Sequence, residues 1–131
     1  LSLHDALPIS LVLEATTAAD LPGTPSGKRV CAPGKGVVIP YMDGGTIYDR
    51  GLFCRLRELA EANHIPWQTK EYLSGGTNGR TYQRSRAGVR VAGLAIATRY
   101  LHAPTSVAAV ADMEGMLELA RAFIGNIAEE S

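Results

Sequence analysis

Cysteine is scarce in this sequence: there are two, Cys31 and Cys54, in 131 residues. Two isolated cysteines exclude a disulfide framework and a paired CxxC site, and reduced thiols in a cytoplasmic protein are expected. Charge of one sign is also lacking, because 13 basic residues balance 13 acidic ones. Nothing in that balance calls for nucleic acid or an anionic membrane as a partner. No apolar run approaches the roughly 20 residues of a membrane-spanning helix.

What the sequence does contain is enough apolar material, 46% of its residues, for one folded domain. Apolar patterning predicts strands at 11–15, 37–41, 66–73 and 89–98. Helical patterning follows at 47–63, at 80–88 and from Asp112 onward, and a long loop rich in Gly, Pro, Ser and Thr fills 16–36. The resulting order, β-loop-β-α-β-α-β-α, indicates an α/β fold with helices on both faces of the sheet.

The helix over 47–63 has the clearest pattern. One face is apolar and consists of Leu52, Phe53, Leu56, Leu59 and Ala60. Asn63 and Pro66 supply the expected stop, and Asp112 is expected to be the N-cap of the last helix.

Two residues are candidates for chemistry because of where they fall relative to strands. Glu14 comes at the end of the strand over 11–15, and His102 follows the strand over 89–98. Open α/β sheets build their sites at the carboxyl ends of strands, where an imidazole could ligate a metal or act as a base. From position alone, Glu14 could instead cap a backbone amide, and His102 could be hydrogen-bonded within a loop. His64, at a helix end, is expected to interact with the helix dipole.

The loop SGGTNG (74–79) raises a different possibility, because glycine loops that enter helices bind anions. It lacks the lysine of a phosphate-binding loop and the GxGxxG spacing of a dinucleotide site. The arginines Arg80, Arg84, Arg86 and Arg90, with Tyr82 among them, could contact RNA. A solvated basic face is the favoured interpretation, and a small nucleotide or RNA binder remains an alternative.

Four stretches in this order have a more specific meaning: LVLEATTAADLPG, VVIPYMDGGTIYDRGL, SGGTNG and TRYLHAPTSV. Together they resemble the C-terminal part of the glutamyl/deblocking aminopeptidases. This cytosolic metallopeptidase family includes the tetrahedral TET aminopeptidases and proteins once labelled cellulase M. The resemblance covers residues 11–130.

The resemblance implies a zinc-peptidase-like α/β/α sandwich that hydrolyses N-terminal residues from peptides. It also implies two divalent metal ions, zinc or cobalt, and a homo-oligomeric full-length protein, the dodecamer being one form. By the family pattern, Glu14 is a ligand of one metal and His102 a ligand of the other. Gly75, Gly76 and Thr77 would then form a wall of the substrate cleft.

The chain departs from the family in two ways. Asn78 stands where an aspartate usually follows Gly-Gly-Thr, which removes a negative charge near the cleft. In addition, the His-x-Asp motif, the bridging aspartate and the Glu-Glu pair with the general base match nothing in this sequence. We therefore expect the chain alone to be inactive and to bind metal weakly. A non-catalytic α/β binding module is the main alternative.

The first nine residues have a separate explanation. One reading frame of a widely used short-read sequencing adapter translates as Leu-Ser-Leu-His-Asp-Ala-Leu-Pro-Ile, as this chain begins. We therefore expect residues 1–10 to be a non-native leader, with no chemistry assigned to His4 and Asp5. Residues 11–131 are expected to be the C-terminal portion of a metallopeptidase catalytic domain.

Overall fold

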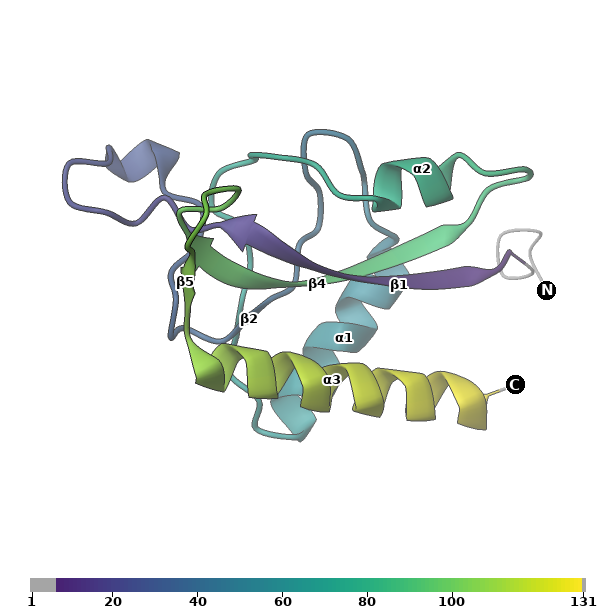
Figure 1. Cartoon of the computed structure of the whole chain (residues 1–131). Coiled ribbons are helices and arrows are strands. Elements are labelled where there is room, and N and C mark those ends of the chain that lie inside the picture. The colour runs from purple at the N-terminus through teal and green to yellow at the C-terminus, as the bar shows by residue number, and fades with distance from the viewer. Residues whose placement is uncertain (1–6, 131) are drawn as a thin grey trace.

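The computed structural model describes residues 7–130, so the interpretation of His4 and Asp5 falls outside the described residues. Its sheet consists of β1 (Ile9–Thr17), β2 (Val37–Val38), β3 (Trp67–Gln68), β4 (Arg90–Arg99) and β5 (Val107–Ala108). The order across the sheet is β1-β4-β2-β3, and β5 also pairs with β4 (Figure 1). The expected α/β fold is confirmed.

The longest pairing joins β1 and β4, which run parallel from Ile9↔Arg90 to Thr17↔Thr98. β4 is buried along most of its length, as its nearly continuous apolar sequence predicts for a central strand. β1 is longer than expected at both ends. It begins two residues before Leu11, and it continues for three residues beyond Glu14, because Ala15–Thr17 pair with Ile96–Thr98. The expectation that the strand ends near Glu14 is therefore wrong.

The other strands are short. The predicted strand over 66–73 is reduced to the two residues of β3, which run parallel to β2. The Gln68 side chain is hydrogen-bonded to the loop before β2. Its carbonyl oxygen accepts from the Ala32 N–H at 3.0 Å, and its amide nitrogen donates to the Ala32 and Gly36 carbonyls at 2.8 Å. Three residues further on, the Glu71 N–H donates to Val30 O. With these contacts the chain leaves the β2–β3 pairing after Gln68. The alternating sequence alone does not predict this departure.

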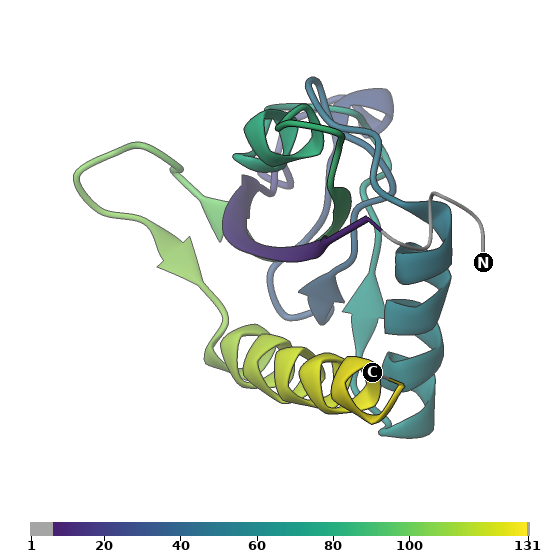
Figure 2. The same ribbon diagram turned by 90° about the vertical axis from the view of Figure 1, so that its right-hand side faces the viewer.

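Helices cover both faces of the sheet, as predicted. α1 (Arg50–Ala62) and α3 (Val110–Glu129) lie on one face, and the short α2 (Gly79–Gln83) lies on the other (Figures 1 and 2). The Asp49 carboxylate caps α1 by accepting from the Leu52 N–H, and Asn63 ends that helix as expected. The core between α1, α3 and the sheet is formed by Val37, Ile39, Leu52, Leu56, Ala60, Ile65, Ala92, Leu94, Leu119, Ala120 and Phe123.

Asp112 is not the N-cap of the last helix. The helix begins two residues earlier, with Ala109 as its N-cap, and Asp112 is buried in the first turn. Its carboxylate accepts from the Gly34 N–H at 2.7 Å and from the Gly36 N–H at 2.9 Å. Asp112 therefore anchors the long loop before β2 to α3, a long-range contact that no local capping pattern contains.

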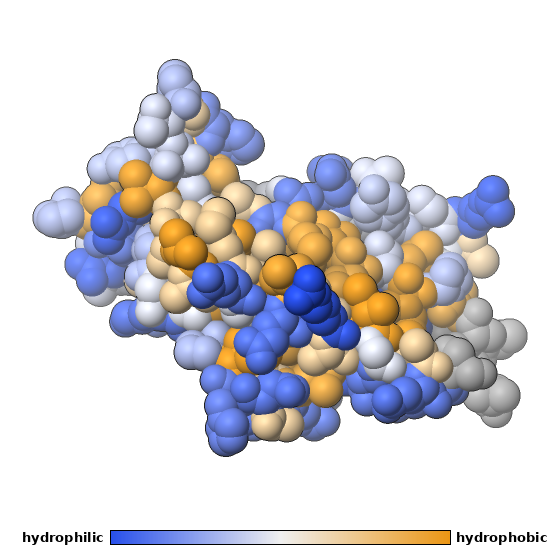
Figure 3. All heavy atoms as spheres, turned by 60° about the horizontal axis from the view of Figure 1, so that its bottom comes forward, coloured by the Kyte–Doolittle hydropathy of each residue, from blue (hydrophilic) through white to orange (hydrophobic). Residues whose placement is uncertain are grey.

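One face of the described structure is apolar and open to solvent. Leu13 on β1 and Leu117 and Ile124 on α3 are each more than half exposed. A groove of about 340 Å³ runs between the two elements, lined by Ile9, Leu11, Phe123, Ile124, Ile127 and Ala128. Figure 3 shows apolar atoms gathered on this side of the molecule. Within the described range, no helix is long and apolar enough to cross a membrane.

The glycine at position 93 is required by close packing. A Cβ there would lie 2.6 Å from Tyr48 Cε1 and 3.2 Å from Pro40 Cγ.

We expect Gly93→Ala to lower the free energy of unfolding by about 1–3 kcal/mol, because the buried Tyr48 ring must move. Urea unfolding measures the change. Gly125→Ala is the control, since its Cβ meets nothing within 4 Å; in mid-helix it should stabilise the chain by about 0.5–1 kcal/mol.

Candidate metal and peptide site

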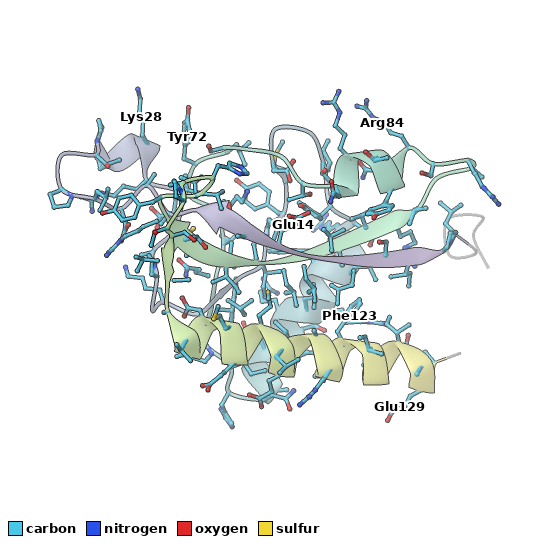
Figure 4. The ribbon with its side chains drawn as sticks, viewed as in Figure 1. Glu14, Lys28, Tyr72, Arg84, Phe123 and Glu129 are labelled. Atoms are coloured by element: carbon cyan, nitrogen blue, oxygen red, sulfur yellow. The ribbon has the colours of Figure 1, made fainter. Side chains whose placement is uncertain are left out.

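The site begins with Glu14, which the parallel pairing places opposite Ala95. On β1, Val12, Glu14 and Thr16 share one face because side chains alternate along a strand. Figure 4 shows the Glu14 side chain on the side of the sheet where α2 lies, away from Phe123 and α3. Its Oε1 accepts a long hydrogen bond of 3.4 Å from the Asn78 N–H. Glu14 therefore faces the glycine loop across the sheet surface.

All the residues predicted for the site line one pocket of about 350 Å³. Its walls contain Glu14, Gly75, Gly76, Thr77 and His102, together with Ala15, Thr16, Thr17, Lys70, Ser74 and Leu101. β1 and β4 are parallel, so the segments that follow them leave the sheet at the same edge, as the sequence predicts for Glu14 and His102. The difference is that Glu14 reaches the pocket from within its strand.

The glycine-loop wall is held from below by a buried carboxylate. Asp43 Oδ1 accepts from the Gly45 and Thr46 N–H groups at 2.8 Å, and its Oδ2 accepts from the Tyr48 hydroxyl at 2.9 Å. Tyr48 Oη and Thr77 Oγ1 are 2.8 Å apart, and Thr77 also donates to Asp43. Burial raises the pKa of the Tyr48 hydroxyl, so this phenol stays protonated and able to donate. Thr77 is thus fixed through Asp43 and Tyr48.

The His102 wall is held by an ion pair. Arg99 Nε and Nη2 donate to the two Asp20 oxygens at 2.9 and 2.7 Å, which ties the loop after β1 to the end of β4. Both residues belong to stretches that carry the family resemblance, Asp20 to LVLEATTAADLPG and Arg99 to TRYLHAPTSV. The chain then turns sharply, with positive φ at Tyr100 and His102, before it returns as β5. His102 is exposed at this turn.

The donor types at the pocket suit a divalent metal, because carboxylate oxygen and imidazole nitrogen are common zinc ligands. They do not amount to a complete site. In the part of the chain that the structure describes, no three His, Cys, Asp or Glu residues are grouped so that they could hold a metal ion. Glu14 and His102 therefore fit the role of partial contributors, and any full coordination set needs further donors.

The arginines do not form a common binding surface. Arg90 Nε is 3.1 Å from Asp49 Oδ2, so Arg90 forms an ion pair with the N-cap residue of α1. Arg84 points away from the body of the molecule (Figure 4), and the Arg80 side chain packs beside Gly45. Arg90 therefore belongs to a largely buried ion pair and not to a solvated basic face with Arg84.

Comparison with known proteins gives the same family as the motifs. Residues 4–119 match the M42 glutamyl aminopeptidase family. The chain belongs to this family. The match starts ahead of Leu11, where the resemblance was expected to begin, and residues 9 and 10 pair within the sheet.

Individual relatives show how much of a longer protein this chain represents. FrvX of Escherichia coli (strain K12) is 30% identical over 122 residues, which cover 93% of this chain and 34% of FrvX. Aminopeptidase APDkam598 from the archaeon Desulfurococcus kamchatkensis superposes with a TM-score of 0.85 at 30% identity, covering 89% of this chain and 34% of that one. For the TET1 peptidase of Pyrococcus horikoshii the TM-score is 0.65 at 25% identity, with 86% and 32% covered. The chain spans about a third of these relatives.

Sequence reasoning missed one pocket residue of this M42 chain, Lys70. It was assigned to a strand, but it lies beyond β3, is buried, and lines the pocket beside Ser74. Its Nζ donates to Ser74 O at 3.2 Å. Burial lowers the pKa of Lys70, while the nearby Asp43 charge acts in the opposite direction. Its position four residues before the SGGTNG loop was the only available signal, and that spacing carries no general meaning.

The Asp20–Arg99 pair generates a prediction about pH. Hydrogen bonding to Arg99 holds the pKa of Asp20 below its ordinary value of about 3.9. A carboxyl whose pKa is lowered by folding stabilises the protein above its unfolded pKa, and this contribution is lost as pH falls through the folded value. We expect Asp20→Asn to be less stable than wild type at pH 6, and the difference to shrink as pH falls below about 4.

Urea unfolding at a series of pH values measures this difference. Glu118→Gln is the matched control, because it removes an exposed carboxylate of α3 that is not part of this ion pair. A pH-independent difference between Asp20→Asn and wild type would contradict the assigned role of the ion pair.

Proposed function

We propose that this chain forms part of the catalytic domain of a metal-dependent aminopeptidase. The observation that carries the proposal is the shared pocket: Glu14, His102 and the Gly75–Thr77 loop, far apart in the sequence, line one cavity. Membership of the M42 family supports the reaction class. In that reaction water adds to the carbonyl carbon of the first peptide bond, and the amide nitrogen leaves with a proton.

In this proposal Glu14 and His102 each supply one ligand to one of two divalent metal ions, zinc or cobalt. Two such ions would polarise the scissile carbonyl and activate water near neutral pH. The remaining ligands and the general base are not among the residues of this pocket. We place them in the two-thirds of the relatives' length that this chain does not span.

The Gly75–Thr77 loop forms the peptide-binding wall in this proposal. Its fixation by Asp43 and Tyr48 supports that role, because a preorganised wall loses little entropy when a substrate binds. The Asn78 N–H, which points at Glu14 Oε1, links this wall to the metal ligand.

The assembly and location remain parts of the same proposal. TET1 of Pyrococcus horikoshii can assemble into a tetrahedron or a large octahedral shell, and another TET1 structure is a dodecamer. We propose that the full-length protein is likewise a homo-oligomer. Both cysteines are free thiols, which supports a cytoplasmic location.

Zinc binding by the chain itself tests the ligand assignment. In NMR titrations with Zn²⁺, the imidazole resonances of His102 should shift before those of His64, because only His102 shares a pocket with a carboxylate ligand. The affinity should be far below that of a four-ligand site. Glu14→Gln should weaken zinc binding at the pocket while leaving any response of His64 unchanged.

The histidine variants provide a matched comparison. His102 and His64 both have positive φ, 66° and 54°, so His102→Ala and His64→Ala carry the same backbone strain. His102→Ala should lower the amount of zinc bound, and His64→Ala should not. Equal effects of the two variants would overturn the assignment of His102 as a ligand.

Peptidase activity of the chain alone is expected to be negligible, because the pocket has at most one ligand for each metal and no general base. Aminoacyl-nitroanilide substrates with added Co²⁺ or Zn²⁺ measure this. Turnover that His102→Ala abolishes would show that the chain is a complete catalyst, against this expectation.

A further inference from the structure

We propose that a groove beside α1 binds an acidic segment of a partner protein, with Arg50 and Arg57 contacting its carboxylates. This inference does not rest on the proposed function, because the groove shares no lining residue with the pocket at Glu14 and His102. It adds an interaction surface and the chemistry of the partner that this surface fits.

The groove has a volume of about 420 Å³ and lies between α1 and the turn that precedes it. The Tyr41 and Phe53 rings meet edge to face in its wall, with their centroids 6.4 Å apart. Ile47 is 68% exposed and Tyr41 is 42% exposed. Aromatic residues and arginine are enriched at protein interfaces and among the residues that dominate binding energy. The full lining is Tyr41, Ile47, Tyr48, Arg50, Phe53, Cys54 and Arg57.

The charge of this groove is positive and uncompensated. Arg50 and Arg57 are seven residues apart, so they lie on one face of α1, about 10 Å apart along its axis. Within the described residues neither side chain forms an ion pair, whereas Arg55 on the same helix pairs with Glu130. No carboxylate of the described chain lines the groove. An acidic partner would therefore complement this surface.

Arg57 supplies the most specific observation. The residue is half-buried, and its Nε is buried without a hydrogen-bond partner in the described part of the chain. A buried donor that lacks an acceptor costs free energy. A carboxylate that accepted from Nε and one Nη together would satisfy this donor in the bidentate geometry that arginine favours. Arg50 lies in the first turn of α1, where the helix dipole also favours a negative charge.

Two observations favour a peptide over nucleic acid as the acidic partner. The chain has 13 basic and 13 acidic residues, so it lacks the overall field that attracts a polyanion. The exposed Ile47 offers aliphatic surface, which suits an apolar side chain and not a stacked base. Residues three positions apart in an extended peptide are separated by about 10 Å, the spacing of Arg50 and Arg57. We therefore expect a segment with two acidic residues three positions apart and a large apolar residue between them.

The test uses two peptides with blocked ends, which lack the free amino terminus on which an aminopeptidase acts. These are acetyl-Glu-Phe-Ala-Glu-amide and its neutral analogue acetyl-Gln-Phe-Ala-Gln-amide. Binding is followed by NMR at the amide resonances of Ile47 and Cys54 in the ¹⁵N-labelled chain. We expect the acidic peptide to bind about tenfold more tightly than the neutral one. The double variant Arg50→Gln with Arg57→Gln should reduce this ratio to about one. Arg121→Gln, which removes an exposed arginine of α3, should leave it unchanged.

The apolar part of the groove has its own variant. Ile47→Ser should weaken the binding of both peptides by roughly threefold and leave their ratio unchanged, because it removes apolar contact area and no charge. Ile124→Ser is the matched control, since Ile124 is 61% exposed on α3 and lies outside this groove.

Several outcomes would overturn the inference. Equal binding of the two peptides by the wild-type chain does so without any variant, and so does an unchanged ratio in the folded double variant. Concentration-dependent shifts of Ile47 and Cys54 in the chain alone, lost in the double variant, would make a second copy the occupant. Displacement of the acidic peptide by octauridylate, at a concentration below the dissociation constant of the peptide, would identify a nucleic-acid site instead.

Discussion

The parallel pairing of β1 with β4 is the constraint on which the site depends. Its nine-residue register fixes Glu14 opposite Ala95 and ends at the pair Thr17 and Thr98, one residue before β4 itself ends at Arg99. A slip of one residue would turn Glu14 toward α3 and away from the pocket. Because the pairing ends near the end of both strands, the segments that follow them leave the same edge of the sheet, and the Asp20–Arg99 pair joins the loop after β1 to the last residue of β4. The position of His102 relative to Glu14 therefore follows from a backbone register.

The opposite wall of the pocket depends on a different kind of interaction. The Gly75–Thr77 loop belongs to no strand and is held by the buried Asp43, through Tyr48 and Thr77. Gly93 makes this possible, since the Tyr48 ring packs where a Cβ at position 93 would lie. Tyr48 thus links the glycine loop to the central strand: its ring packs against Gly93 of β4, and its hydroxyl lies 2.8 Å from Thr77 Oγ1.

The sequence predicts the parts of this arrangement that local patterns encode. The apolar run of β4, the apolar face of α1 and the position of His102 after a strand follow from spacing, whereas Glu14 lies within β1 and not at its end. Asp112 and Lys70 could not be placed in this way. Asp112 looks like a local cap but bonds to Gly34 and Gly36, and Lys70 looks like one side of a strand that is only two residues long. Both roles are set by tertiary contacts, which override propensity.

The two faces of β1 link the pocket to the open apolar surface. Glu14 faces the pocket, whereas Ile9 and Leu11 line the groove against α3, and β1 is the edge strand of the described sheet. A strand that paired with β1 would therefore extend both features at once. Its side chains on one face would stand beside Glu14, and those on the other would cover Leu13 and the groove. Side chains alternate between the two faces of each strand. A strand paired with β1 would therefore bury this apolar surface and add donors next to Glu14 at the same time. The same pairing that stabilises the sheet would also build the site.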